Sequence, residues 1–218
     1  QQTHQLPREI IKEFFPDCRY FTLIGPGFAG EVTRDMPTIV NLGYGEEKDE
    51  AGDIAALFET DTFRVRTVRA VQILELSAAL KNIYAIGCGL ADGLGYEINT
   101  RTLLTVIAIE EVQKLFSALK LGVGINSVAG TIGDLMLTCN SIESRNFRFG
   151  RNLAHYSIKK SLAKVNATVE GYTTLESLAF LEKKSDTTLP LAEFIKTCVI
   201  EDNPKKLKKS FELFIKNS

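Results

Sequence analysis

The periodicity of the sequence changes near residue 70, and this change constrains the fold more than any other feature. Over residues 20–69, the strand-like runs YFTLIGP, PTIVNLGY and FRVRTV alternate with a helical run at residues 49–59. This alternation is typical of an α/β domain. Beyond it, long segments with helical periodicity dominate. The sequence therefore predicts an α/β region at residues 1–69 and an all-helical region at residues 70–218.

Glycines interrupt the first helix expected after this boundary. Starting near Ala70, apolar residues at helical spacing, from Ile73 to Ile86, form one broad face. The GCGLADGLG run at residues 87–95 then indicates either a break in the helix or very close helix packing. Further helices are expected at residues 6–15, 100–119, 134–139, 144–155, 173–183, 190–200 and 204–216.

Charge and composition argue against several classes of partner. The 26 basic and 27 acidic residues nearly cancel, so no net field favours nucleic acid. The basic tail NPKKLKKS, residues 203–210, is interpreted as a solvated face, with a nucleic-acid or membrane patch as the alternative. No uninterrupted apolar run long enough to cross a bilayer and no secretory signal are recognised, which predicts a cytoplasmic protein without membrane contact. Scattered cysteines, with no CxxC pair and no nearby histidines, predict no metal site.

Lys81 is the first candidate for chemistry, because it lies in the apolar and glycine-rich run LKNIYAIGCG. An ammonium taken out of water is costly unless a partner holds it. With Asn82 beside it, the lysine could act as a general base that removes a hydroxyl proton. The alternative is a lysine that lays its stem over a core and keeps its head in water.

A second candidate is the pair Asp134 and Thr138, whose spacing places both on one face of a helix. The carboxylate could pair with Lys81 and hold it. An aspartate in the first turn is also what any helix N-terminus favours. The spacing leaves both interpretations open.

Ser144, Arg145 and Asn146 form a third candidate. Serine is a preferred N-cap, and an arginine just inside a helix start adds a planar set of donors to free backbone N–H groups. That combination suits a phosphate. The arginine could instead belong to a solvated surface stripe with Arg148 and Arg151.

Two glycine-containing segments are weaker candidates. The GPGFAGEV segment at residues 25–32 follows a predicted strand, so that its backbone could approach a ligand closely or simply form a tight strand-to-helix turn. The VEG segment at residues 169–171 indicates nothing without a family context.

The order of these motifs resembles that of the bacterial NAD-dependent glycerol-3-phosphate dehydrogenases. From near Phe21 to about Pro190, the chain carries GP-x-FA-x-E, LKN with a glycine-rich tail ending in N-x-R, GDL-x-LTC, SRN followed by FG, and VEG. The resemblance implies the remainder of a Rossmann-type α/β domain, followed by an all-α domain like the C-terminal domain of 6-phosphogluconate dehydrogenase. It also implies that a homodimer interconverts sn-glycerol 3-phosphate and dihydroxyacetone phosphate with NAD or NADP, for phospholipid precursor synthesis.

The same resemblance implies roles for individual residues. Lys81 would accept the hydroxyl proton, and Asp134 would fix the lysine and the substrate hydroxyls. The implied substrate-binding residues are Gly25, Gly27, Asn82, Thr138, Ser144, Arg145 and Asn146, and the implied cofactor-binding residues are Ala29, Arg145, Thr168 and Glu170.

The chain departs from the family at several positions, none of which removes a charged catalytic group. Gly27 stands where the family usually has a hydroxyl or amide side chain, so a side-chain contact is lost there. Glu97, Thr131 and Ala78 stand where the family prefers glycine.

The chain is expected to be a piece of a longer protein. It does not begin with methionine, and neither a dinucleotide-binding glycine turn nor the family's threonine-lysine-glycine segment precedes Lys81. We therefore expect little or no activity from these residues alone. The alternative is a non-catalytic helical module for dimerisation or sugar-phosphate binding, and a dehydrogenase of a different hydroxy acid is a second rival.

Overall fold

The computed structural model describes residues 4–46, 48–122 and 127–217. The chain divides into two compact units, which are described separately below. The first unit comprises Gln1–Ala78 and Lys120–Leu137, and the second comprises Ala79–Leu119 and Thr138–Ser218. The division of the sequence into domains at residues 1–69 and 70–218 stays a prediction.

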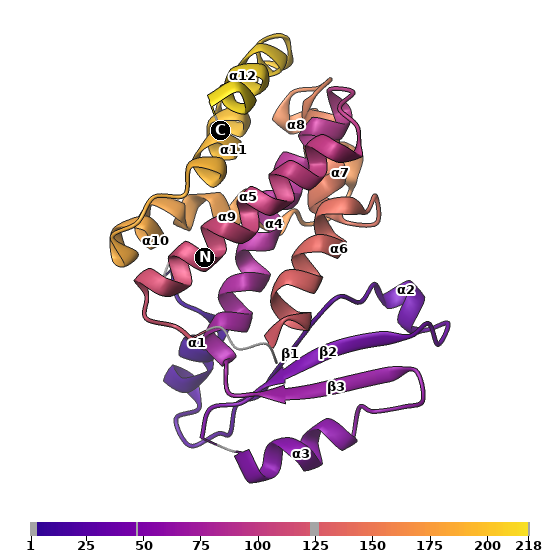
Figure 1. Cartoon of the computed structure of the whole chain (residues 1–218), viewed down its shortest axis with the longest axis vertical. Coiled ribbons are helices and arrows are strands. Elements are labelled where there is room, and N and C mark those ends of the chain that lie inside the picture. The colour runs from indigo at the N-terminus through magenta and orange to yellow at the C-terminus, as the bar shows by residue number, and fades with distance from the viewer. Residues whose placement is uncertain (1–3, 47, 123–126, 218) are drawn as a thin grey trace. The chain divides into compact units, whose positions relative to one another are not determined.

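The first unit contains a three-stranded sheet with the order β1-β2-β3 (Figure 1). Strand β1 (Thr22–Ile24) runs antiparallel to β2 (Thr38–Gly43), which runs parallel to β3 (Phe63–Val68). Parallel neighbours need a crossover connection, and helix α3 (Lys48–Ala56) supplies it. This β2-α3-β3 unit confirms the predicted α/β character.

The core of this sheet is built from its alternating apolar residues. Val40, Leu42 and Val65 are buried together with Ala55 of α3. The small side chain of Ala55 lets the helix backbone lie close to the strands, and Phe63 packs against the edge of the cluster. The short helix α2 (Ala29–Val32) follows β1, so the glycine segment after β1 forms a strand-to-helix turn.

A buried carboxylate attaches the N-terminal helix α1 (Pro7–Phe14) to the first unit. Glu75 is 4% exposed and accepts hydrogen bonds from the backbone N–H of Arg8 at 3.1 Å and from the Tyr20 hydroxyl at 2.6 Å. Burial raises the pKa of Glu75. Helix α1 itself has no fully buried residue, so this carboxylate is an important link between α1 and the rest of the unit.

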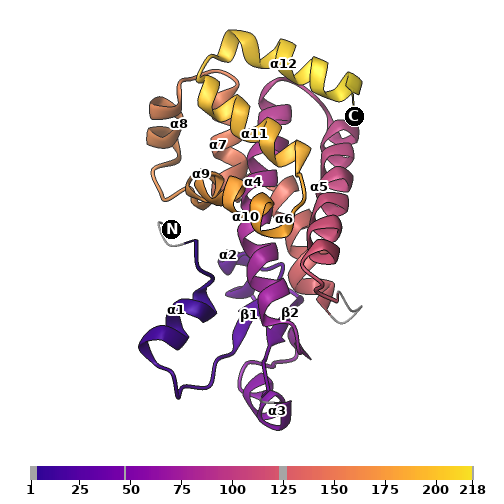
Figure 2. The same cartoon turned by 90° about the vertical axis from the view of Figure 1, so that its left-hand side faces the viewer.

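The second unit is helical throughout its described part, as predicted (Figure 2). The segment expected as one helix at residues 173–183 forms three consecutive pieces instead, and helix α8 was not predicted. Helix α4 (Val71–Gly93) begins in the first unit and continues into the second. The π-helical turn η2 (Ala129–Gly133) lies in the first unit, and α6 (Asp134–Asn140) begins there. The other elements of the second unit are α5 (Ile98–Ala118), α7 (Arg145–Leu153), α8 (Ile158–Val165), α9 (Glu170–Thr174), η3 (Leu175–Ser177), α10 (Leu178–Ser185), α11 (Pro190–Glu201) and α12 (Pro204–Asn217).

The glycine-rich run in α4 serves close helix packing, and the helix continues through it to Gly93. A Cβ atom added at Gly89 would lie 2.0 Å from the carbonyl oxygen of Phe147 in α7, and one added at Gly150 would lie 1.9 Å from that of Ile86. Each helix therefore presents a glycine where the backbone of the other approaches. Of the two interpretations left open by the sequence, close packing is the one found.

The length and composition of helix α4 also bear on membranes. Among the described residues it is the one helix that is long and apolar enough to cross a bilayer, although polar residues such as Glu75 and Lys81 interrupt its apolar run. Of its most apolar window, 83% is buried inside the protein. This burial is what a core helix shows.

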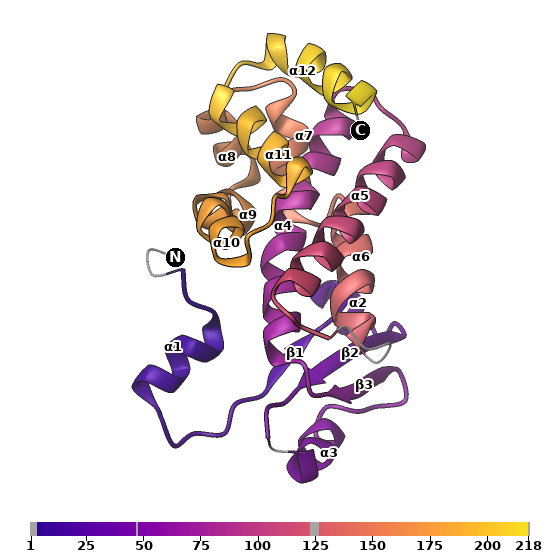
Figure 3. The same cartoon turned by 60° about the vertical axis from the view of Figure 1, so that its left-hand side comes forward.

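A second buried carboxylate connects helices far apart in the sequence. Glu111 of α5 is 6% exposed and accepts hydrogen bonds from the Tyr84 hydroxyl at 3.0 Å and from the backbone N–H groups of Leu191 at 2.5 Å and Ala192 at 3.3 Å. It thereby caps the N-terminus of α11. Helix α12 follows α11 (Figure 3), and Phe194 of α11 packs against Phe211 and Phe214 of α12.

Replacing Glu111 by glutamine should change how stability depends on pH. Burial raises the pKa of this carboxyl in the folded protein above its ordinary 4.5. Between the two values the folded protein binds more protons than the unfolded chain, so its unfolding free energy falls as pH rises. Urea unfolding from about pH 4 to about pH 7 should show a steeper fall for wild type than for Glu111→Gln. Parallel curves would contradict this.

Candidate functional site

A buried amide cluster joins three segments of the second unit. The side-chain nitrogen of Asn146 in α7 donates to the side-chain oxygen of Asn82 in α4 at 2.9 Å, and its oxygen accepts from the backbone N–H of Gly171 in α9 at 2.8 Å. Asn82 and Asn146 are 7% and 5% exposed. A Cβ atom at Gly171 would lie 2.4 Å from the carbonyl oxygen of Asn82, so only glycine allows this contact.

Glu170 extends the cluster toward solvent. One oxygen of its carboxylate accepts from the Asn82 side-chain nitrogen at 3.2 Å, and the other pairs with the Arg145 guanidinium at 3.3 Å. The Arg145 and Glu170 side chains are 45% and 52% exposed. The structure thus brings together four of the predicted site residues, a buried amide pair and a solvent-accessible ion pair.

Ser144 begins α7 as its N-cap. Its side-chain oxygen accepts from the backbone N–H of Phe147 at 3.3 Å, and the residue is 6% exposed. This capping role confirms the start predicted for the helix. Arg145 is the first residue of the helix, and its side chain is exposed. The free backbone N–H groups at this helix start favour an anion.

Replacing Ser144 by alanine is expected to lower the unfolding free energy by about 1 kcal/mol, because the N-cap hydrogen bond is lost. Urea unfolding measures the change. Ser157→Ala is the matched control: Ser157 is the N-cap of α8 but makes no capping hydrogen bond through its side chain, so its change should be about 0.5 kcal/mol or less. Equal losses in both variants would argue against the capping role.

The remaining predicted residues of the second unit differ in exposure. Lys81 is half-buried on α4 next to Asn82, and Thr138 is buried on α6 at 7% exposure. Thr168 is exposed and lies just before Val169, the N-cap of α9. Lys81 and Thr138 both take part in interactions within the folded chain.

The first unit carries the other predicted residues in the turn between β1 and α2. Gly25 lies so close to β2 that a Cβ atom there would be 2.6 Å from the Cα of Val40. A Cβ atom at Gly133 would lie 3.4 Å from Pro26 Cγ, so the turn lies against the start of α6. Asp134, the first residue of α6, is 3% exposed. Gly27 is exposed in the same turn, and Ala29 is exposed as the first residue of α2.

Asn41 is a structural support that the sequence analysis missed. It is fully buried in β2, where its side-chain oxygen accepts from the backbone N–H of Gly130 at 2.7 Å and its nitrogen donates to the carbonyl of Arg66 at 3.1 Å. It therefore fixes the π-helical turn η2 that precedes Asp134. A polar residue in the middle of the apolar strand IVNLG is the signal that could have revealed it.

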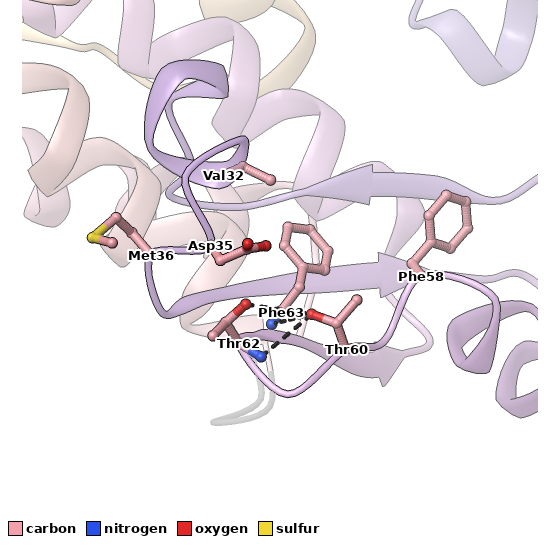
Figure 4. A pocket seen from close by; sticks show the side chains of 7 residues that line it. All are labelled: Val32, Asp35, Met36, Phe58, Thr60, Thr62 and Phe63. Atoms are coloured by element: carbon pink, nitrogen blue, oxygen red, sulfur yellow. Dashed lines mark hydrogen bonds between the residues drawn. The ribbon is translucent and has the colours of Figure 1, made fainter.

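A cavity of about 280 Å³ lies elsewhere in the first unit (Figure 4). It lies where the parallel strands β2 and β3 begin, whereas dinucleotides bind at the carboxyl ends of such strands. No predicted site residue lines this cavity. Its lining consists of Val32, Asp35, Met36, Phe58, Thr60, Thr62 and Phe63. Within the described residues, no group of three or more His, Cys, Asp or Glu could hold a metal ion.

Comparison with known proteins agrees with this fold and these motifs. The profile of the family described as NAD-dependent glycerol-3-phosphate dehydrogenase C-terminus matches residues 71–209. The chain is 35% identical over 192 residues to a glycerol-3-phosphate dehydrogenase (NAD(P)+) of Francisella philomiragia, covering 87% of this chain and 57% of that protein. It is 36% identical over 188 residues to the protein of the same name from Ruthia magnifica, covering 85% of this chain and 58% of that one.

Solved structures show the same fold. The crystal structure of glycerol-3-phosphate dehydrogenase from Coxiella burnetii matches 98% of this chain and 65% of its own, with a TM-score of 0.87 and 27% identity. A yeast glycerol-3-phosphate dehydrogenase shares the fold at 21% identity, with a TM-score of 0.78 over 94% of this chain and 62% of its own. The chain thus spans less than two thirds of the length of each of these four relatives. It belongs to the NAD-dependent glycerol-3-phosphate dehydrogenase family, and the family's C-terminal region makes up most of it.

Proposed function

We propose that the chain forms the substrate-binding part of an enzyme that interconverts sn-glycerol 3-phosphate and dihydroxyacetone phosphate with NAD or NADP. The observation that carries this proposal is the Asn82, Asn146, Arg145 and Glu170 cluster, which places an exposed guanidinium at a helix N-terminus near the segment that carries Lys81. A module with a purely structural role would have no need of this exposed anion-binding group beside a buried amide pair.

The roles proposed for individual residues follow from the family resemblance. In the oxidative direction, Lys81 Nζ would accept the proton of the C2 hydroxyl, which becomes a carbonyl as hydride leaves C2. Asp134 would orient the lysine and the substrate hydroxyls, with Asn82 and Thr138 beside the reacting carbon. Ser144, Arg145 and Asn146 would hold the phosphate, and the backbone at Gly25 and Gly27 would lie against the substrate.

The redox step belongs to the cofactor: the nicotinamide would take up the hydride. The residues proposed to hold the cofactor are Ala29, Arg145, Thr168 and Glu170. All four are exposed in their own units, so their surfaces fit a role in binding a ligand. We also propose that the enzyme is a cytoplasmic homodimer that supplies phospholipid precursors, and that its domains divide at residues 69 and 70.

The proposal predicts that the 218 residues alone are nearly inactive, because most of the surface that positions the nicotinamide would be missing. The test is NADH oxidation with dihydroxyacetone phosphate, by the chain alone and by the chain fused to the portion of the Francisella philomiragia protein that it does not match. Activity in the fusion only would support the proposal. Ordinary turnover by the chain alone, on the order of 1 per second, would contradict its expected inactivity.

A non-catalytic sugar-phosphate-binding module is the rival. The second unit by itself contains both Arg145 and the N-terminus of α7, the two features that favour an anion. Binding of glycerol 3-phosphate by a well-folded fusion that neither binds NADH nor turns over would favour the rival.

A further inference from the structure

Glu170 connects the proposed phosphate-binding residue to the helix that carries the proposed base. Its two carboxylate oxygens have different partners: Oε1 pairs with Arg145 at 3.3 Å, and Oε2 accepts from Asn82 at 3.2 Å. Asn82 follows Lys81 directly in α4. One carboxylate thus contacts both an exposed cation and a buried amide.

The backbone under this carboxylate has little freedom to move. Gly171, the next residue, donates its N–H to the buried side chain of Asn146. The Gly171 Cα also lies against α4, since a Cβ atom there would be 2.4 Å from the carbonyl oxygen of Asn82. A change at the carboxylate is therefore taken up by the Glu170 side chain and the two side chains that it contacts, and not by movement of α9.

An anion at Arg145 must compete with this carboxylate. Arginine binds phosphate best through two parallel N–H donors, and one of its terminal nitrogens is already paired with Glu170 Oε1. A phosphate that takes this nitrogen leaves Glu170 with Asn82 as its remaining partner in the cluster. Because both side chains of the ion pair are about half exposed, the exchange costs little free energy and is reversible.

We propose that Glu170 is a positioning residue that couples anion binding at Arg145 to the orientation of Asn82. This role rests on the proposed function, which assigns the phosphate to Arg145, and adds to it a link from the phosphate end of the substrate to the reacting end. Phosphate binding shifts the carboxylate toward Asn82 and strengthens that hydrogen bond, which fixes the side-chain amide of the residue that follows Lys81 in α4.

Glutamine at position 170 cannot play this role, because it has one acceptor oxygen and one donor nitrogen. Its oxygen can accept from Arg145 or from Asn82, and its NH₂ group then faces the other donor. The link between Arg145 and Asn82 is therefore broken, while the size of the side chain is kept. Glu176→Gln is the matched control, since Glu176 is exposed, lies six residues further along the chain in η3 and loses the same charge.

The experiment is a titration of the full chain with inorganic phosphate and with glycerol 3-phosphate, followed by NMR at the Arg145 guanidinium and the Asn82 side-chain amide. In wild type and in Glu176→Gln, both signals should move with one dissociation constant. In Glu170→Gln, the Arg145 signal should still move, with affinity about two- to fivefold tighter because the competing carboxylate is gone. The Asn82 signal should no longer respond.

The outcomes separate this inference from the proposed function. If the Arg145 signal does not respond to either ligand, the phosphate assignment is wrong and the coupling falls with it. If Arg145 responds but Asn82 does not, or if Asn82 responds equally in Glu170→Gln, the phosphate assignment stands and the coupling alone is wrong.

A reversed pair provides an independent check that the hydrogen bond to Asn82 exists in solution. Asn82→Asp places two carboxylates face to face and should destabilise the fold. Adding Glu170→Gln restores a donor–acceptor pair with reversed polarity, which should recover most of the lost unfolding free energy in a double-mutant cycle. Additive losses in urea unfolding would overturn the proposed link.

Discussion

Lys81→Ala is expected to lower kcat by about 10²- to 10⁴-fold in the fusion that contains the dinucleotide-binding half, because the proposed function makes Lys81 the acceptor of the C2 hydroxyl proton. Phosphate binding by Arg145 should survive, so KM for glycerol 3-phosphate should change far less than kcat. Initial rates in both directions measure the two constants. The half-buried position of Lys81 on α4, next to the buried Asn82, means that the lysine stem can be removed without opening the centre of the core.

Two further variants separate proton transfer from charge. Lys81→Arg keeps a cation, but a guanidinium stays protonated at working pH and cannot serve as a base. It should be nearly as slow as Lys81→Ala. Lys183→Ala, at an exposed position on α10, should leave kcat unchanged. Near wild-type turnover in Lys81→Arg would show that the lysine contributes charge alone and that the base is another group.

Gly150→Ala is expected to be the most destabilising of the small substitutions considered. The added Cβ would lie 1.9 Å from the carbonyl oxygen of Ile86 and 2.9 Å from the backbone nitrogen of Leu90. Backbone atoms within α4 cannot rotate away as a side chain can, so the helices must separate and lose packing along their contact. We expect a loss of about 3 kcal/mol in unfolding free energy, a large share of the stability of an ordinary domain.

Chemical unfolding of Gly150→Ala should be compared with that of Gly52→Ala. Gly52 lies within α3, and an added Cβ there would meet nothing within 4 Å. The control should therefore gain about 0.5–1 kcal/mol from better helix propensity. A neutral Gly150→Ala would mean that α4 and α7 do not approach as closely in solution as the structure shows.

Local patterns predicted the strands better than the short helices. FRVRTV was predicted as a strand, and β3 has these bounds, because β-branched residues and alternation are properties of the segment itself. Helix α8 was missed because it is only eight residues long, although Ile158, Leu162 and Val165 in IKKSLAKV follow helical spacing. The helix expected at residues 173–183 ends and restarts within a few residues, which local periodicity does not reveal.

Local sequence patterns could not predict contacts between residues that are far apart in the chain. Whether the glycines of α4 break the helix or pack it closely is decided by Gly150 and Phe147 in α7, about sixty residues further along. The importance of Gly171 likewise arises from the carbonyl oxygen of Asn82. Motif order predicted Asn82, Arg145, Asn146 and Glu170 as site residues, but it did not predict the hydrogen bonds among them, which depend on how the helices pack.

The attachment of α1 through Glu75 has a consequence for local unfolding. Because α1 has no fully buried residue, it can open without disrupting the core, and its amides should exchange with deuterium early. The Arg8 amide is the exception, since its exchange requires release from the Glu75 carboxylate. That release also exposes the Glu75 carboxylate, which accepts from the Tyr20 hydroxyl as well, to water. The N-terminal helix therefore shields the Glu75 carboxylate from water. The exchange rate of the Arg8 amide reports how often that carboxylate becomes hydrated.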